Sequence, residues 1–141
     1  MARDLSGRTI TLAGETHRIR YTLEEKEFIV GRAPSGEERQ LGKLIFSDDP
    51  AVHKAIIYAG IKGANRKTHL TVDAVGTKMQ EHNDLGGYYD RDVLLPCILE
   101  ICDSRILGYG ANTEGIKAYL QKLFADAEAE EEGKAAPVVA E

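Results

Sequence analysis

The sequence predicts an α+β protein that is mainly α, with an N-terminal β-hairpin packed on a bundle of about five helices. Residues 7–21 alternate between apolar and polar with the period of a β-strand, whereas apolar residues from position 22 onward recur at three- and four-residue steps. We therefore expect one globular domain over residues 1–127, with the hairpin at 7–21 and helices over 22–127. Residues 128–141 are acidic and have little to bury, which favours a disordered tail.

The hairpin is predicted from two alternating runs joined by a tight turn. Ile10 and Leu12 share one face of the first run, and Ile19 and Tyr21 share one face of the second. The sequence Ala13-Gly14-Glu15 between the runs is typical of a turn. Because an isolated hairpin is only marginally stable in water, the helices that follow must cover its apolar face.

Helix-capping residues mark the starts of the first helices. Thr22 with Glu25 has the spacing of a capping box, and Phe28 to Val30 continue that helix as far as Gly31. A second short amphipathic segment, residues 37–46, places three apolar residues on one side: Leu41, Leu44 and Ile45.

The central helix is the best-defined helix of the middle of the chain. Asp48 or Asp49 can cap it and Pro50 suits its first position. Its apolar stripe is formed by Val52, Ala55, Ile56 and Ala59. Gly60, Gly63 and Asn65 follow, and we expect them to adopt the left-handed conformations that end a helix.

The second half of the chain predicts three further helical segments. Thr71 caps the first, whose buried stripe consists of Val72, Val75 and Met79. Asp90 can cap a strongly apolar segment, in which Pro96 predicts a kink or a late helix start near Leu95. Asn112 or Thr113 can cap the last helix, which carries the cleanest apolar stripe: Ile116, Tyr119, Leu120, Leu123 and Phe124.

Composition excludes several classes of protein. The formal net charge of -5 argues against binding to a nucleic-acid backbone, although basic pairs occur at Arg18/Arg20 and Arg66/Lys67. No apolar run approaches the ~20 residues that cross a bilayer, and residues 1–11 lack the apolar core of a secretory signal. Cys97 and Cys102 have no second pair to complete a zinc site, so we expect buried reduced thiols and a cytoplasmic protein.

Catalytic and cofactor motifs fail on their spacing. Residues 36–44 resemble a phosphate loop, but the glycines are one residue too far apart and Leu44 replaces the magnesium-binding hydroxyl. The third glycine of a dinucleotide fingerprint at residues 108–115 is misplaced. We expect the histidines to be surface or half-buried residues, and Asp92 and Asp103 to face solvent. The sequence thus predicts no enzyme, no metal and no cofactor.

Two families are similar to parts of the chain. Residues 28–32, 45–54 and 73–77 resemble the layout of a forkhead-associated domain, which binds phosphothreonine peptides. That family has a serine-arginine-x-histidine run at its pocket, whereas this chain has His53-Lys54-Ala55-Ile56. The helical caps and stripes also contradict the all-β sandwich of that family. A degenerate module of this kind is one alternative prediction.

The second resemblance covers most of the chain. A glycine-containing hairpin ending in an Arg-x-Arg-Tyr-Thr strand leads into a Glu-rich helix, then into Ala55-Ile56-Ile57-Tyr58-Ala59-Gly60-Ile61 and a Leu70-Thr71 helix start. This order resembles the tail assembly chaperones of long-tailed bacteriophages and gene transfer agents. Another small phage morphogenesis protein, such as a head-tail connector, is the other alternative prediction. The resemblance implies a non-enzymatic protein of the host cytoplasm that forms homo-oligomers and coats the helical tape measure protein.

The same resemblance implies how partners are bound. In that family a ribosomal frameshift often yields a longer form that recruits tail tube protein, and Gly133-Lys134 fits the slippery codons. An apolar client helix requires an exposed groove, which we expect between the central helix and residues 93–107. Ile57 and Tyr58 lie off the main stripe, and we expect either exposed contacts or completion of the core. The candidate partner-binding residues are Ile57, Tyr58, Ile61, Leu95, Ile116, Tyr119, Leu120 and Leu123.

Overall fold

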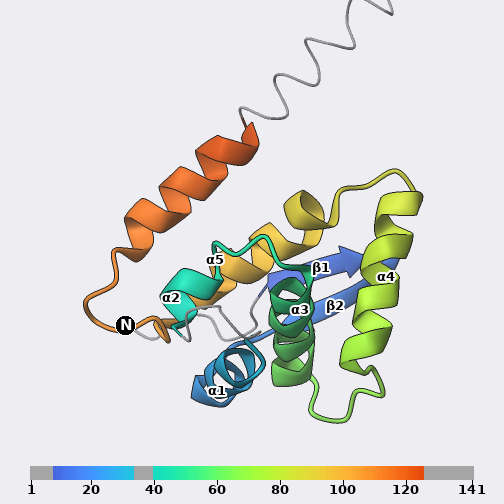
Figure 1. Ribbon diagram of the computed structural model, residues 1–141, viewed down its shortest axis with the longest axis horizontal. Coiled ribbons are helices and arrows are strands. Elements are labelled where there is room, and N and C mark those ends of the chain that lie inside the picture. Colours follow the sequence, from blue (N-terminus) through green and yellow to red (C-terminus); the bar gives the residue numbers. More distant parts are fainter. Residues whose placement is uncertain (1–7, 34–39, 126–141) are drawn as a thin grey trace, which may run out of the picture. The chain divides into compact units, whose positions relative to one another are not determined.

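The chain forms two compact units, residues 1–111 and 112–141, of which the computed structural model describes residues 8–33 and 40–125 (Figure 1). The first unit contains a hairpin of β1 (Arg8–Leu12) and β2 (Glu15–Ile19) and most of the helices. These helices are α1 (Leu23–Gly31), α2 (Leu41–Leu44), α3 (Pro50–Ala64), α4 (Val72–Asp84), the π-helical turn η1 (Asp90–Leu94) and α5 (Leu95–Ser104). The prediction of a mainly helical α+β fold with an N-terminal hairpin is confirmed. Parts of the predicted segment 37–46 and the whole tail 128–141 lie outside the described residues.

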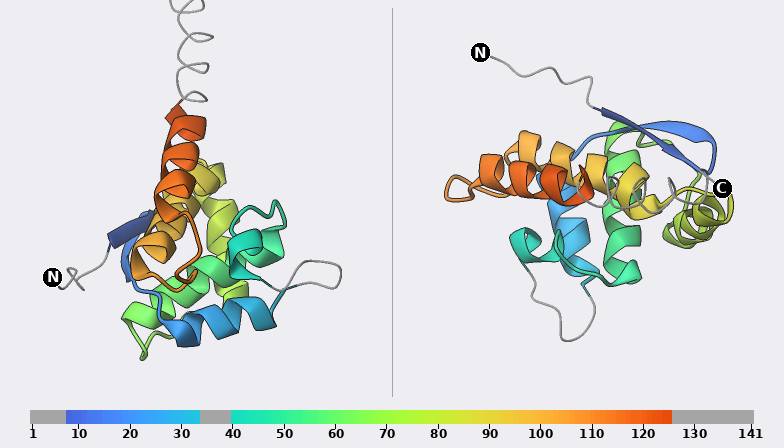
Figure 2. Two further views of the ribbon diagram at one scale, coloured as in Figure 1. Left: turned by 90° about the vertical axis from the view of Figure 1, so that its left-hand side faces the viewer. Right: turned by 90° about the horizontal axis from the view of Figure 1, so that it is seen from above.

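The hairpin is a regular antiparallel pair. Ile10 lies opposite His17 and Leu12 opposite Glu15, and the connecting residues Ala13 and Gly14 have φ values of 51° and 84°. Two positive φ values give a turn whose twist matches that of the strands it joins. Figure 2 shows the hairpin lying against one side of the helices, and it contacts α3 through β2 and α5 through β1. The predicted covering of its apolar face is therefore confirmed: Ile10, Leu12 and Ile19 are all buried.

The predicted helix starts are confirmed at three places. The backbone amide of Thr22 donates to Glu25 Oε1 at 2.8 Å, which forms one half of the capping box. Asp49 Oδ1 accepts from the amide of Ala51 at 2.9 Å, and Thr71 Oγ1 accepts from the amide of Ala74 at 3.1 Å. Each contact satisfies an amide that the first helical turn leaves without a backbone partner.

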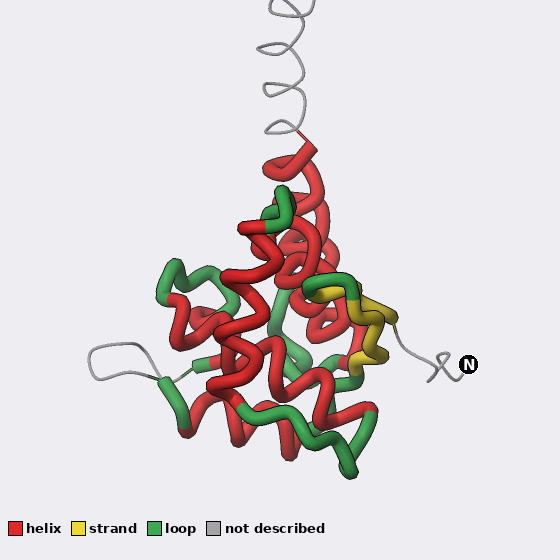
Figure 3. The backbone as a smooth tube through the Cα atoms, turned by 90° about the vertical axis from the view of Figure 1, so that its right-hand side faces the viewer, coloured by secondary structure: helices red, strands yellow, loops and turns green. Residues whose placement is uncertain are grey.

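Helix α3 is the centre of the first unit because other elements pack around it. It contacts α1, β2, α4, η1 and α5, and Figure 3 shows the helices gathered beside the two yellow strands. Its buried residues are Val52, His53, Ala55, Ile56, Ile57, Ala59, Gly60, Ile61 and Gly63. The predicted stripe is confirmed, but burial extends well beyond it.

The prediction that Gly60 and Gly63 end the central helix is wrong. Both lie inside α3, which continues to Ala64, and Asn65 has an extended φ of -139°. A Cβ at Gly60 would lie 2.5 Å from the Tyr21 hydroxyl, and one at Gly63 would overlap the carbonyl oxygen of Arg20. These glycines allow the end of β2 to pass directly over the helix. At this crossing the amide of Arg20 donates to the Gly60 carbonyl at 2.9 Å.

The apolar segment after α4 contains a π-helical turn followed by a regular helix. Helix α5 begins at Leu95 and has Pro96 in its first turn, where a missing amide hydrogen costs nothing. The predicted late start near Leu95 is confirmed. Asp90 does not precede the helical segment as a cap, because Tyr89 is already helical and Asp90 Oδ1 accepts only from the adjacent amide of Arg91.

One buried histidine joins three elements. His53 is 7% exposed, so the expectation of a surface or half-buried residue is wrong at this position. Its Nε2 lies 2.6 Å from the Ser47 carbonyl oxygen, and its Nδ1 lies 2.7 Å from the Tyr89 hydroxyl. Because a carbonyl can only accept, Nε2 must carry a hydrogen. His53 therefore fixes the segment before α3 to the segment before η1.

Two aspartates that were expected to face solvent are in ion pairs instead. Asp103 Oδ2 lies 2.7 Å from Arg8 Nη1, which also contacts the buried Glu100 at 2.9 Å. Asp92 Oδ2 lies 2.9 Å from His82 Nε2, while His82 Nδ1 accepts from the amide of Ala13 at 3.0 Å. These contacts fasten β1 to α5 and the hairpin turn to α4 and η1.

The Asp92 contacts predict a specific acid sensitivity. Burial alone would raise the pKa of Asp92, but hydrogen bonds from Arg91, His82 and the Tyr88 amide lower it from 3.8 to about 2. Because the folded pKa is depressed, the stabilisation is complete above pH 4 and disappears as pH falls toward 2. After discounting for solvent screening we expect Asp92→Asn to cost about 1 kcal/mol at pH 6. Urea unfolding should show this gap at pH 6 and a much smaller one at about pH 2. A gap that stays constant between these pH values would contradict the assignment.

Candidate functional site

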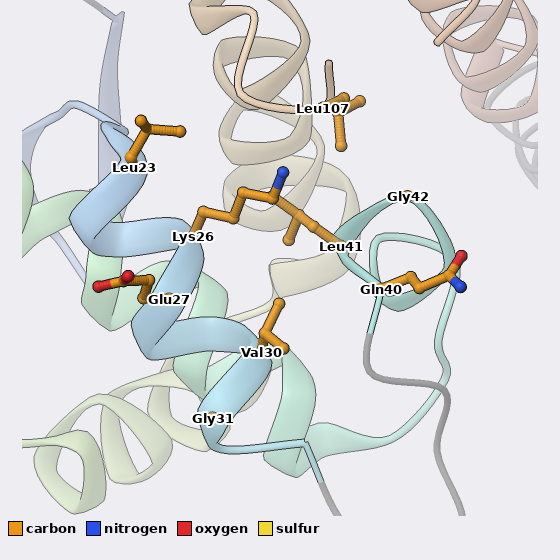
Figure 4. Close-up of a pocket in the computed structure, with 9 residues that line it drawn as sticks. All are labelled: Leu23, Lys26, Glu27, Val30, Gly31, Gln40, Leu41, Gly42 and Leu107. Carbon is orange, nitrogen blue, oxygen red and sulfur yellow. The ribbon is translucent and has the colours of Figure 1, made fainter. Parts of the chain in front are cut away.

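An apolar groove lies between α1 and α2 in the first unit. It has a volume of about 770 Å³ and is shown in Figure 4. Helix α1 forms one wall, α2 forms the facing wall, and Leu107, which follows α5, closes one end. The lining residues are Leu23, Lys26, Glu27, Val30, Gly31, Gln40, Leu41, Gly42 and Leu107.

The groove exists because α1 has apolar residues on opposite sides. Ile29 is buried in the core and Phe28 packs on Tyr58 of α3, with ring centroids 5.3 Å apart. Leu23 and Val30 lie on the side that lines the groove. With only residues 8–33 and 40–125 described, Leu23 on this second apolar side is 67% exposed.

Two glycines, Gly31 and Gly42, are among the residues that line the groove. A Cβ at either position would have no atom within 4 Å, so neither glycine is required by a close backbone contact. A larger side chain at either position would therefore begin in open space beside the groove lining. The facing Leu41 is 2% exposed and supplies an apolar floor.

Polar groups border the apolar lining. The ammonium of Lys26 donates to the carbonyl of Ile106 at 2.8 Å, while Glu27 and Gln40 stand on opposite walls (Figure 4). An apolar floor with a polar border is the arrangement by which proteins accept amphipathic segments, because the segment's polar face stays in water. The lining contains no pair of groups arranged for acid-base or nucleophilic chemistry.

The structure places the predicted contact residues of the first unit elsewhere. Ile57 is fully buried and Ile61 is 2% exposed, so the expectation that Ile57 is an exposed contact is wrong and the core alternative holds. Leu95 is half-buried. Tyr58 is half-buried and borders a small hollow of about 140 Å³, together with Phe28 and Arg66. Of residues 93–107, Leu107 is among the residues that line the α1–α2 groove.

The second unit contains a helix over residues 113–125. The amide of Gly115 donates to Asn112 Oδ1 at 3.1 Å, which confirms the predicted cap. Four of the predicted contact residues lie on this helix at three- and four-residue steps: Ile116, Tyr119, Leu120 and Leu123. That spacing places them along one face of the helix.

The described residues offer no arrangement for metal or thiol chemistry. No group of three or more His, Cys, Asp or Glu could hold a metal ion within residues 8–33 and 40–125. Cys97 and Cys102 are buried thiols that form no disulfide with each other, as expected, and burial raises the pKa of the Cys97 thiol to about 12. A thiol with that pKa is not a nucleophile near neutral pH. None of the described helices is both long and apolar enough to span a bilayer.

Comparison with protein-family models, with curated proteins and with solved structures gives no significant match in any of the three.

Proposed function

We propose that the protein is a phage tail assembly chaperone whose α1–α2 groove binds an amphipathic helix of the tape measure protein. The open apolar groove is the observation that supports this proposal most directly. An extended helical client presents apolar residues every three or four positions, and these residues need a complementary groove to stay out of water. The protein acts without catalysis, in the host cytoplasm. The forkhead-associated alternative does not fit, because the described residues contain only two strands.

The size of the groove favours weak binding by many copies. Three leucine-sized client side chains placed in it would gain about 5–9 kcal/mol from burial. Ordering and association consume a large part of that gain, so one groove alone binds weakly. Multiple copies on one client raise the total affinity, yet each copy remains easy to displace. Such reversibility suits a coat that is replaced when the tail tube protein, recruited by a longer frameshifted form, assembles around the client.

Co-expression tests the proposal directly. We expect this chain to keep the adjacently encoded tape measure protein soluble and to copurify with it in many copies per client. The chain alone and the client alone serve as controls, and the client alone should be insoluble. Recovery of the tape measure protein only in inclusion bodies, with a correctly folded chain in the soluble fraction, would exclude this function.

A further inference from the structure

The net negative charge of the protein comes entirely from the end of the chain. Of 18 Lys and Arg and 23 Asp and Glu, residues 126–141 hold one lysine and six acids. Residues 1–125 therefore contain 17 charges of each sign, and residues 126–141 carry the whole net charge of -5. Five of the six acids fall within the seven residues 126–132. A neutral body followed by a short, dense acidic segment is typical of an interaction tail.

The fold brings the backbone of Arg20 against the end of α3, close to a second basic stretch of the sequence. Arg18 and Arg20 lie on or just after β2, on the exposed side of the strand, because the intervening Ile19 is buried. The end of this strand passes over α3 at Gly63, and the exposed Lys67 follows Gly63 by four residues. We call Arg18, Arg20 and Lys67 the basic cluster.

The basic cluster differs from several other cations of the described residues, which have acidic partners. Arg66 contacts Glu25 at 2.8 Å and Lys78 contacts Glu15 at 2.6 Å. Within the same ranges, no ion pair involves Arg18, Arg20 or Lys67. The cluster is therefore an exposed cationic surface on a body with no net charge.

We infer that the acidic segment 126–132 of one copy docks on the basic cluster of a second copy. Donor and acceptor are different surfaces of the chain, so each copy can give one such contact and receive another. A contact of this head-to-tail kind continues from copy to copy and yields an open chain of subunits. The inference goes beyond the proposed function and holds whatever the client is.

The contact has a definite salt dependence. The three cations are exposed to solvent, and the acids lie in a highly charged segment. Ion pairs between such groups weaken as the screening length falls. Association should therefore rise with protein concentration at low ionic strength and disappear at high ionic strength. Association through an apolar interface would not weaken at high ionic strength, since salt does not screen apolar contacts.

Sedimentation velocity on the full chain tests the inference. At about 50 mM NaCl the weight-average sedimentation coefficient should rise between about 10 and about 300 μM protein, and at about 500 mM NaCl it should stay at the monomer value. Two full-length variants should stay monomeric at low salt: Arg18→Glu/Arg20→Glu/Lys67→Glu, and a tail variant with Glu128, Glu130, Glu131 and Glu132 all changed to Lys. Mixing them pairs each reversed surface with an opposite charge and should restore association.

Two results would overturn the inference. One is a wild-type chain that stays monomeric over the whole concentration range at low salt. The other is a wild-type association that the cluster reversal leaves unchanged, which would assign self-association to another surface. Unchanged circular dichroism spectra of the variants exclude misfolding as the cause of lost association. A matched control, Lys43→Glu, changes an exposed cation outside the cluster and should associate like the wild type.

Discussion

Replacing Gly63 with alanine is expected to destabilise the protein by about 3 kcal/mol or more. The added Cβ would overlap the carbonyl oxygen of Arg20, and it would also lie 3.0 Å from the side chain of the buried Glu25. A backbone carbonyl cannot move aside without displacing the end of β2, whose neighbour Tyr21 is itself buried and donates to the Ile56 carbonyl at 2.6 Å. The clash outweighs the gain of about 1 kcal/mol that alanine brings to a helix interior.

Urea unfolding of three variants measures this effect with a matched comparison. Gly60→Ala should also be destabilised, because its Cβ would meet the fully buried ring of Tyr21 at 2.5–3.0 Å. Gly31→Ala in α1 has open space around its Cβ and should be neutral or gain up to about 1 kcal/mol. Equal stabilities for Gly63→Ala and Gly31→Ala would show that β2 does not pass over α3 as described.

The fold was largely predictable because its signals are local. The capping oxygens of Asp49 and Thr71 act on amides two or three residues away, and Pro96 sets the start of α5 through its own ring. The prediction for Gly60 and Gly63 was wrong because the role of these two glycines depends on a contact with a distant part of the chain. A glycine that permits a left-handed turn and a glycine that permits close backbone contact look the same in one sequence. Only the position of β2, which lies some 40 residues earlier in the chain, distinguishes them.

The groove could not be predicted because it forms only when α1, α2 and Leu107 pack together. In the sequence, Leu23 directly follows the capping residue Thr22, and Gly42 lies in the stretch that resembles a phosphate loop. The choice between an exposed and a core position for Ile57 could not be made from one apolar stripe, because α3 is covered by neighbours on several sides. An apolar residue with 67% exposure, such as Leu23, becomes a recognisable signal only once its neighbours are in place.

Filling the groove should abolish client binding and leave the fold intact. Gly42 lines the groove, and phenylalanine at this position would have its Cβ in open space, from which its ring can reach the groove lining. We expect Gly42→Phe to weaken copurification of the tape measure protein at least tenfold, equivalent to about 1.4 kcal/mol. Thermal unfolding should change little, since Gly42 is exposed and no atom needs to move.

Two further variants separate a blocked groove from a damaged helix. Gly42→Ala adds only a methyl group, gains helix propensity, and should bind the client like the wild type. Leu23→Asp acts from the opposite wall: it places a charge where client side chains must lose water, and it should lose binding as Gly42→Phe does. If Gly42→Phe and Leu23→Asp both retain full client solubility with unchanged unfolding, the groove is not the client site. The apolar face of helix 113–125, with Ile116 and Leu123, would then be the surface to test next.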